Sequence, residues 1–264
     1  MIFYYLLSLG LNIINIPYDR GANIRGSRKA YTALQNKLDF LDIESTYIVN
    51  DKNDIDKIFS IGSNQTYNCV KNNKFPLIIG GDHSISISSI FGINRYYKDI
   101  DKRLGVLWCD AHADFNTIHT SPSGNIHGMP VSILCGHSNP VFSYNSYLNP
   151  KQFAYFGLRD IDSLEFNRLQ DYNMQILYNI DEFREWSENF DVIHLSFDFD
   201  CLDPQIVSCV NTPVENGVGL IELKNLFKNL RETNKLVSMD FVEYNPEKGD
   251  DSEVVVELLK TLFF

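Results

Sequence analysis

The sequence has no pair of cysteines with CxxC spacing and no zinc-finger arrangement of cysteine and histidine. Structural zinc sites usually show such spacings, so we expect none here. An odd number of cysteines in a chain of 264 residues is typical of reduced thiols rather than of a disulfide framework. We therefore expect a cytoplasmic protein whose cysteines are free, at positions 69, 109, 135, 201 and 209.

Positive charge is also scarce. There are 23 lysines and arginines against 34 aspartates and glutamates, which gives a formal net charge of −11. Proteins that bind nucleic acid usually need a basic surface to neutralise phosphates, so we expect no nucleic-acid partner. An acidic surface favours a cationic small molecule, although only weakly.

The sequence lacks a stretch that reads clearly as a membrane span or a signal peptide. Its start, MIFYYLLSLGLNIINI, is apolar and uncharged but short for a span. It also has neither the basic region nor the small-residue cleavage site of a signal peptide. We interpret it as a leader followed by the first core strand, and we expect no membrane partner.

No linker or shift of composition divides the chain, so we expect residues 1–264 to form a single domain. Short apolar runs alternate with amphipathic stretches, which is typical of crossover units with a parallel sheet covered by helices on both faces. The segment LIELKNLFKNL predicts one of these helices, and SEVVVELLKTLFF predicts a final helix capped by Ser252. The expected strands are residues 11–16, 46–49, 76–79, 105–109, 153–157, 175–178, 192–197 and 236–239.

Polar residues follow four of these strands. In an open parallel sheet the carboxyl ends of the strands line one crevice, so the four clusters are expected to meet there. The motifs are PLIIGGDHS with Asp82 and His83, VLWCDAHAD with Asp110, His112 and Asp114, VIHLSFDFDCLDP with Asp198, Asp200 and Asp203, and VSMDFVEYNP with Asp240 and Glu243.

Several carboxylates in one low-dielectric crevice repel one another unless cations are bound. Two divalent ions and one hydroxide nearly neutralise Asp110, Asp114, Asp198 and Asp200, and His83 and His112 complete a ligand set rich in oxygen. Such a set suits manganese better than structural zinc, and it predicts a binuclear site that activates water.

Each motif taken alone also has an ordinary structural explanation, such as a surface strand end, a mononuclear site or a helix cap. Three motifs in order, each after a core strand, favour the metal site. We expect Asp203 and Asp240 to be structural and Cys201 to be a buried thiol. No role is predicted for His119, His137 and His194.

With these motifs the chain resembles the ureohydrolase superfamily, which includes arginase and agmatinase, over roughly residues 11–262. The resemblance implies a three-layer α/β/α fold with a central eight-stranded parallel sheet, two Mn²⁺ ions per subunit, and a homo-oligomer, commonly a trimer or hexamer. It implies that His83, Asp110, Asp114 and Asp198 bind one ion and that His112, Asp110, Asp198 and Asp200 bind the other.

Within this superfamily the segment DFNTIHTSPSGNIHGMPVS most resembles arginases. Agmatinases have a shorter stretch before the histidine of the GNxHG turn, and formimidoylglutamases lack that histidine. The resemblance places Asn116 and Ser123 at the substrate α-carboxylate, Asp162 and Glu165 at the α-amino group, and Thr212 and Glu243 at the guanidinium. His127 is the expected proton shuttle, because the pKa of an unperturbed histidine lies near neutral pH.

We therefore hypothesise hydrolysis of L-arginine to L-ornithine and urea, with His127, Asp114 and Glu243 as catalytic residues. Two features depart from the family pattern. Cys201 replaces a usual glycine, and VNTPVENGVGL replaces a more glycine-rich loop. The alternatives are another guanidino hydrolase of the agmatinase or guanidinobutyrase type, a catalytically silent metal-binding homologue, and a deacetylase of the same fold, against which the six-ligand pattern argues.

Overall fold

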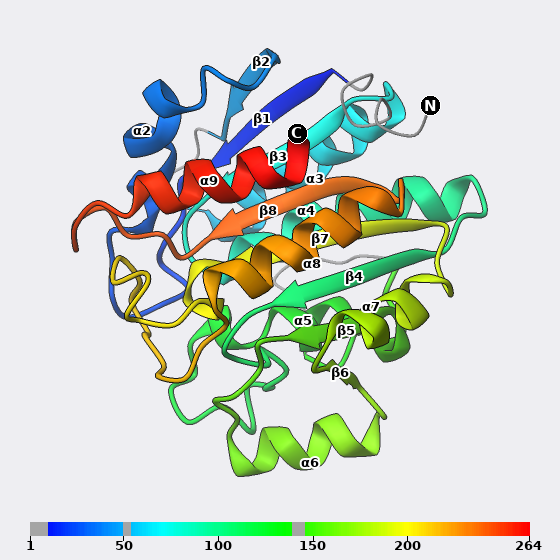
Figure 1. Ribbon diagram of the computed structural model, residues 1–264. Coiled ribbons are helices and arrows are strands. Elements are labelled where there is room, and N and C mark those ends of the chain that lie inside the picture. The colour runs from blue at the N-terminus through cyan, green and yellow to red at the C-terminus, as the bar shows by residue number, and fades with distance from the viewer. Residues whose placement is uncertain (1–9, 50–53, 139–145) are drawn as a thin grey trace.

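A sheet of eight parallel strands forms the middle layer of the computed structural model (Figure 1). The structure describes residues 10–49, 54–138 and 146–264, so most of the predicted leader lies outside the described residues. The strand order is β2-β1-β3-β8-β7-β4-β5-β6. The strands are β1 (Leu11–Ile16), β2 (Ile43–Ile48), β3 (Phe75–Gly80), β4 (Leu104–Cys109), β5 (Phe153–Phe156), β6 (Gln175–Leu177), β7 (Val192–Asp198) and β8 (Leu236–Val242).

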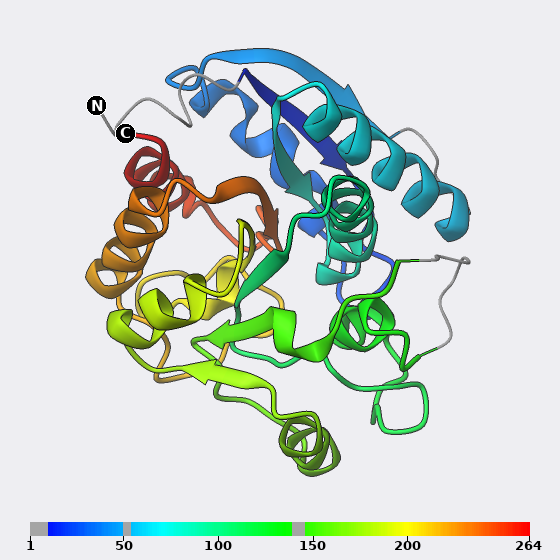
Figure 2. The ribbon, with the colours of Figure 1, turned by 90° about the vertical axis from the view of Figure 1, so that its right-hand side faces the viewer.

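Helices cover both faces of the sheet, as Figure 2 shows in a view turned from the first. Alternate residues of each central strand enter different cores, because neighbouring side chains of a strand point to opposite faces. In β4, Leu107 packs in one core and Trp108 in the other. The first core is closed by α2 (Ala30–Leu34), α7 (Ile180–Ser187), α8 (Leu220–Glu232) and α9 (Ser252–Phe263), and the second by α3 (Ile55–Lys71), α4 (Ser86–Asp99) and α5 (Pro130–Leu134). The predicted three-layer α/β/α architecture is confirmed.

Shorter elements complete the chain. The helix α6 (Ser163–Asp171) lies beside the β6 edge of the sheet (Figure 1). Single 3-10 turns are η1 (Ser27–Lys29), η2 (Gln35–Lys37), η3 (His83–Ile85), η4 (Ile126–Gly128), η5 (Pro150–Gln152) and η6 (Phe199–Cys201).

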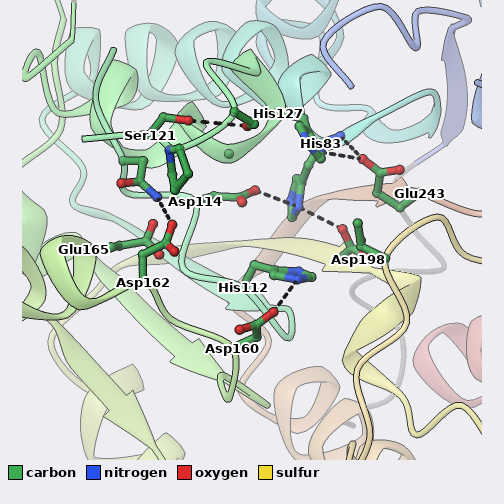
Figure 3. A pocket seen from close by; sticks show the side chains of 15 residues that line it. His83, His112, Asp114, Ser121, His127, Asp160, Asp162, Glu165, Asp198 and Glu243 are labelled. Carbon is green, nitrogen blue, oxygen red and sulfur yellow. Dashed lines mark hydrogen bonds and ion pairs between the residues drawn. The ribbon is translucent and has the colours of Figure 1, made fainter. Parts of the chain in front are cut away.

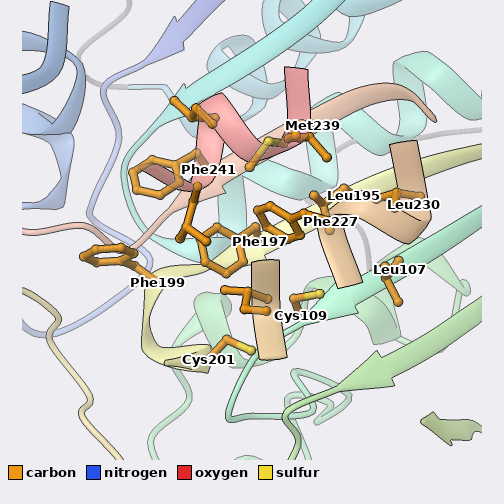
Figure 4. Packing of buried hydrophobic residues seen from close by; sticks show 14 of the residues in the cluster. Leu107, Cys109, Leu195, Phe197, Phe199, Cys201, Phe227, Leu230, Met239 and Phe241 are labelled. Atoms are coloured by element: carbon orange, nitrogen blue, oxygen red, sulfur yellow. The ribbon is translucent and has the colours of Figure 1, made fainter. Parts of the chain in front are cut away.

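Aromatic side chains fill the core between the sheet and α8 (Figure 4). Phe197 of β7 packs edge-on against Phe227 of α8 at a centroid distance of 5.5 Å, and it also contacts Phe241 of β8 at 5.9 Å. Aromatic side chains of this size bury much apolar surface each and favour edge-to-face contacts. The packing fixes the ends of β7 and β8, where functional residues follow.

Most strand boundaries match the sequence predictions or differ from them by one residue, and the largest differences, of three residues, are the start of β2 at Ile43 and the end of β8. The strand β8 continues to Val242, because Asp240, which resembles a strand end in sequence, is a fully buried member of the strand whose carboxylate contacts His194. The helix α9 does start at Ser252, but Asp251 occupies the N-cap position, so the predicted Ser252 cap is wrong by one residue. The backbone N–H of Ser252 is bound instead by Asp250 Oδ1 at 3.0 Å.

None of the helices in the described part of the chain has the length and apolar character needed to cross a bilayer.

Candidate metal centre and active site

Four neighbouring strands of the sheet, in the order β3-β8-β7-β4, deliver the predicted site residues. His83 lies in η3 after β3, Asp110 follows β4, Asp198 ends β7, and Glu243 follows β8. The carboxyl ends of parallel strands meet at one edge of the sheet, so residues up to 160 positions apart in sequence become neighbours. The four motifs therefore converge as expected.

His83 is the centre of the first group of candidate ligands. Its Nδ1 lies 2.9 Å from Asp110 Oδ2, 3.1 Å from Asp198 Oδ2 and 3.3 Å from Asp114 Oδ2. All four side chains are buried. Figure 3 shows His83 pointing toward Asp114 and Asp198.

His112 belongs to a second group. Its Nδ1 lies 3.1 Å from Asp200 Oδ2 and 3.4 Å from Asp110 Oδ1. The ligand atoms of His112, Asp110 and Asp200 lie within 4.8 Å of one another, as do those of His83, Asp110 and Asp198. Asp110 therefore takes part in both groups and faces each with a different oxygen.

Burial and crowding shift the pKa values of these side chains. Burial and neighbouring aspartates raise the pKa values of Asp114 and Asp198 well above the usual range of a carboxyl group. Burial by itself lowers the pKa of His83, but the close carboxylate of Asp110, with other carboxylates, outweighs it and raises the pKa to about 9. Without a counter-charge, the ionised carboxylates destabilise one another and the imidazole holds a proton.

These residues fit a bound cation. The buried Nδ1 of His83 has no hydrogen-bond partner among the described residues, although three carboxylate oxygens surround it. Nδ1 is therefore directed between the carboxylates rather than at one of them. A buried polar atom left unpaired is costly, and a divalent ion bound between imidazole and carboxylates removes both this cost and the repulsion.

His127 and Glu243 lie beside the first group. Nδ1 of His127, in η4, is 3.4 Å from Glu243 Oε1, which also accepts a 2.9 Å hydrogen bond from the backbone N–H of His83. The second carboxylate oxygen, Oε2, is buried and has no hydrogen-bond partner among the described residues. Glu243 also has a φ of 61°, a left-handed conformation that is uncommon for a residue with a side chain and often marks a functional site.

Burial lowers the pKa of His127, but its hydrogen bond to Glu243 and the Glu243 charge outweigh burial, so the pKa lies above its usual value. The imidazole is partly exposed, with 22% of its side-chain surface accessible. It can therefore exchange protons with solvent or with a bound ligand.

The predicted substrate residues line one pocket above the candidate metal ligands. Asn116 donates from Nδ2 to Asp162 Oδ2 at 3.1 Å, and Ser123 is exposed at the rim, 3.5 Å from the hydroxyl of Ser121. Thr212 donates to the candidate ligand Asp200 at 3.0 Å. Glu165 is buried and accepts a hydrogen bond from the backbone N–H of Phe115 at 2.7 Å, so one of its carboxylate oxygens is already used within the protein.

Two further pocket residues with polar side chains were missed by sequence reasoning. Asp160 Oδ2 lies 3.5 Å from His112 Nε2, and the two residues form an isolated parallel bridge. Ser121 lies beside Ser123 in the same rim. Asp160 is two positions before Asp162 and follows β5, so the rule that polar residues after strands reach the crevice could have found it. Ser121 has no comparable signal in the sequence.

The remaining polar residues of the motifs have structural contacts. Asp203 accepts backbone N–H groups of Gln205 and Gly217, at 2.9 Å each, and Asp240 contacts His194 inside the sheet. The thiol of Cys201 is fully buried against the carbonyl of Phe156. These contacts agree with the structural roles predicted for Asp203, Asp240 and Cys201.

Comparisons with known proteins agree with this geometry. The family model described as Arginase family matches residues 10–264. The chain is 31% identical to the arginase of Bacillus caldovelox and 32% identical to the arginase of Staphylococcus aureus (strain MRSA252), and each alignment covers 96% of this chain and 97% of the relative. The crystal structure of Entamoeba histolytica arginase in complex with L-ornithine matches with a TM-score of 0.89 at 28% identity, covering 97% of this chain and 99% of that one.

Proposed function

Since this chain belongs to the arginase family and is a hydrolase of guanidino C–N bonds, we propose that its substrate is L-arginine and its products are L-ornithine and urea. The observation that carries the proposal is the unpartnered, buried Oε2 of Glu243, next to a cluster of candidate metal ligands. The planar N–H donors of a guanidinium match a carboxylate in this position.

We further propose that the ligand groups hold two Mn²⁺ ions. Six side chains supply carboxylate oxygens and two imidazoles, and this mixture suits a hard divalent ion such as manganese. Such a pair of ions, when bound, supplies Lewis acidity and lowers the pKa of water. Asp110 belongs to both groups and Asp198 to the first, and by family resemblance these two carboxylates would help to hold both ions.

Glu243 orients the guanidinium in this proposal. Its Oε1 is fixed by the backbone N–H of His83, which limits the orientations of a carboxylate that lines the pocket and whose Oε2 has no hydrogen-bond partner among the described residues. Thr212 lines the same pocket beside Asp200. Holding the guanidinium carbon still next to the water-activating cluster lowers the entropic part of the barrier.

The α-amino acid end of the substrate is held at the opposite rim. The N–H donor of Asn116 that now meets Asp162 is the kind of donor that a carboxylate needs. When a substrate carboxylate takes this donor, Asp162 is free to accept the substrate ammonium group. Ser123 supplies a second donor, and Glu165, which lines the same pocket, adds negative charge near the ammonium when it is ionised.

Protons move through two residues. Asp114 lines the pocket beside His83, and its carboxylate would accept a proton from the attacking water once bound cations balance the neighbouring aspartates. His127 donates a proton to the leaving amine as the tetrahedral carbon breaks down to urea and ornithine. Its contact with Glu243 keeps the imidazole aimed at the guanidinium end of the pocket.

The Entamoeba histolytica arginase, which shares this fold, was crystallised in complex with L-ornithine, and that complex supports the same product here. By family resemblance we also expect a homo-oligomer, a trimer or hexamer, which light scattering coupled to size exclusion measures directly.

The main alternative is another guanidino hydrolase, which would act on a substrate without the α-carboxylate or with it in a different place. Steady-state rates of urea release from L-arginine, agmatine and 4-guanidinobutyrate, after loading with Mn²⁺, separate the candidates. We expect kcat/KM for L-arginine to exceed that for agmatine by at least tenfold. A preference for agmatine refutes the proposed substrate, and no urea from any of the three refutes catalysis.

A further inference from the structure

The four residues from Asp114 to Thr117 join the metal ligands to the proposed substrate-carboxylate site. Asp114 contacts His83, and Asn116 lies two residues later in the pocket wall. Asp114 has a φ of 49°, which is unfavourable for a residue with a side chain. Such a conformation persists only where the surroundings hold it, so the contacts of this segment decide where the Asn116 amide lies.

The two peptide groups on either side of Phe115 are held by different partners. The peptide between Asp114 and Phe115 is bound at both ends, because its carbonyl accepts the Val131 N–H at 3.0 Å and its N–H donates to Glu165 at 2.7 Å. The next peptide, which leads into Asn116, is bound through the Phe115 carbonyl. This carbonyl accepts the hydroxyl of Ser132 at 2.8 Å and Nε of Arg168 at 3.1 Å.

Arg168 and Ser132 are themselves joined, because Nη2 of Arg168 donates to the Ser132 hydroxyl oxygen at 3.0 Å. The Arg168 guanidinium, the Ser132 hydroxyl and the Phe115 carbonyl therefore form a closed set of hydrogen bonds, in which Arg168 and Ser132 also orient one another. A guanidinium that donates to two acceptors has little orientational freedom, and a hydrogen bond from a charged donor is stronger than a neutral one.

The helix α6 presents Arg168 to this segment. Asp162 at its N-cap, Glu165 and Arg168 follow one another at intervals of three residues, which places them along one face of the helix. These three side chains contact Asn116, the Phe115 N–H and the Phe115 carbonyl in turn. One face of α6 therefore lies along Phe115 and Asn116 and contacts each of them.

Packing of the Phe115 ring adds to the hydrogen bonds. The ring is fully buried, and the guanidinium carbon of Arg168 lies 4.7 Å from its centroid. Tyr172, at the end of α6, meets the same ring edge-on at 5.7 Å. A cation over an aromatic face is attracted to it, so Arg168 holds Phe115 by its ring as well as by its carbonyl.

We propose that Arg168 and Ser132 are positioning residues for substrate selectivity: through the Phe115 carbonyl they fix the peptide that leads into Asn116, and so they set recognition of the substrate α-carboxylate. This inference rests on the proposed function, which gives Asn116 its contact with the carboxylate. Neither residue lines the pocket, so neither acts by touching the substrate. The peptide that follows Asp114 has its own partners, so loss of Arg168 leaves the metal ligands in place.

The test compares ligands with and without a carboxylate. Arg168→Met keeps an extended side chain against the Phe115 ring but removes the donors, and Ser132→Ala removes the other donor. We expect R168M to raise the KM for L-arginine and the Kd for L-ornithine by about tenfold, the loss typical of a charged hydrogen bond. Four quantities should stay within about twofold of their wild-type values: the kcat for L-arginine, the kcat/KM for agmatine, the Kd for 1,4-diaminobutane and the metal content. S132A should change the same quantities in the same direction. In the double variant R168M/S132A the increase in KM and Kd should be smaller than the product of the two single increases, because both donors act on one carbonyl.

Arg184→Met is the matched control, since Arg184 lies on the exposed side of α7, where it contacts Asp181 and Asn229. We expect this variant to keep the wild-type KM and Kd values for all of these compounds and the wild-type metal content. If R168M does not fold, as thermal melting reports, S132A carries the same comparison alone. Wild-type affinity for L-ornithine in S132A and R168M overturns the inference, as does an equal loss for L-ornithine and 1,4-diaminobutane. A wild-type enzyme that prefers agmatine refutes the proposed function before any variant is compared, so the two failures are distinct.

Discussion

The indole ring of Trp108 stacks on the imidazole of His83, with centroids 4.1 Å apart and planes inclined by 6°. The same indole donates its N–H to Asp110 Oδ2 at 2.9 Å. One buried side chain in β4 therefore orients a histidine that follows β3 and an aspartate that follows β4. These two candidate ligands are held in place by the protein before any ion binds, and such outer contacts tune metal affinity.

Trp108→Phe tests this arrangement. Phenylalanine keeps an aromatic face for His83 but cannot donate to Asp110, so we expect affinity for Mn²⁺ to fall by about 10–100-fold, as is usual for contacts that orient a ligand. Titration calorimetry on metal-free protein measures the affinity. Trp186→Phe is the matched control, because Trp186 is equally buried and its indole nitrogen has no hydrogen-bond partner among the described residues. Equal affinities in the two variants would contradict the role of Trp108.

The residues predicted as metal ligands lie close together in the structure because each follows an apolar strand of one parallel sheet. A short apolar run such as VLWC favours a buried strand, and the sheet then determines where the next polar residues go. The eight strands and the three layers follow from the same alternation. Boundaries are harder to predict where a buried polar residue interrupts an apolar run, as Asp240 does in β8.

Contacts between segments far apart in sequence could not be predicted in the same way. Nothing near Arg168 in the chain signals that its guanidinium binds the carbonyl of Phe115, 53 positions earlier. The hydrogen bond that Glu165 accepts from the Phe115 N–H could not be predicted from the sequence for the same reason. Such contacts depend on how α6 is placed against the loop, which is a property of the tertiary packing.

Metal binding should depend on pH through His83. Its pKa of about 9 means that, below this pH, a proton must leave the imidazole before a cation binds. We therefore expect the Kd for Mn²⁺ to increase by about tenfold per unit of falling pH for each proton displaced, as competition between proton and cation requires. Calorimetry at pH 7 in two buffers with different enthalpies of ionisation counts the protons released. Release of no proton at pH 7 would contradict the raised pKa.

Glu165 should make metal-free protein less stable as the pH rises. Burial, partly opposed by the hydrogen bond from Phe115, raises its pKa from the ordinary value of 4.5 to about 7. Between these two values the folded state holds a proton that the unfolded state has lost, so the free energy of unfolding declines as pH rises through this window, by up to about 3 kcal/mol.

Glu165→Gln removes this ionisation while its amide oxygen can still accept the Phe115 N–H. We expect the variant to match the wild type in Tm at pH 4.5 and to exceed it by several degrees at pH 8, in the absence of metal. Glu185→Gln, at an exposed position of α7, is the control and should show the same Tm difference from wild type at both pH values. A constant difference for Glu165→Gln as well would show that Glu165 is ionised across the range.

Asp198→Ala should remove metal and turnover together. Asp198 is buried, lies 3.1 Å from His83 Nδ1 and is a proposed bridging ligand. Its loss leaves the first ligand group incomplete and removes a side chain that the proposed function assigns to both ions, so metal content measured by plasma mass spectrometry should drop well below that of the wild type. Asp181→Ala, at an exposed position of α7, is the control. Full metal content with normal turnover in D198A would remove Asp198 from the ligand set.

His127→Asn separates metal binding from proton transfer. His127 contacts Glu243 but none of the six candidate ligands in any described ion pair, so the variant should bind metal as the wild type does. The proposed shuttle is lost, because an amide does not titrate near neutral pH. We therefore expect kcat for L-arginine to fall by about 10²–10⁴-fold, the range for removal of a general acid. His119→Asn is the matched control, since His119 lies exposed in the same loop. Metal content, kcat and the basic limb of the pH–rate profile, where a general acid loses its proton, should be measured for both variants. A His127→Asn enzyme that keeps the wild-type kcat would exclude the imidazole from the reaction. An equal decrease of kcat in both variants would indicate a disturbed loop rather than loss of proton transfer by His127.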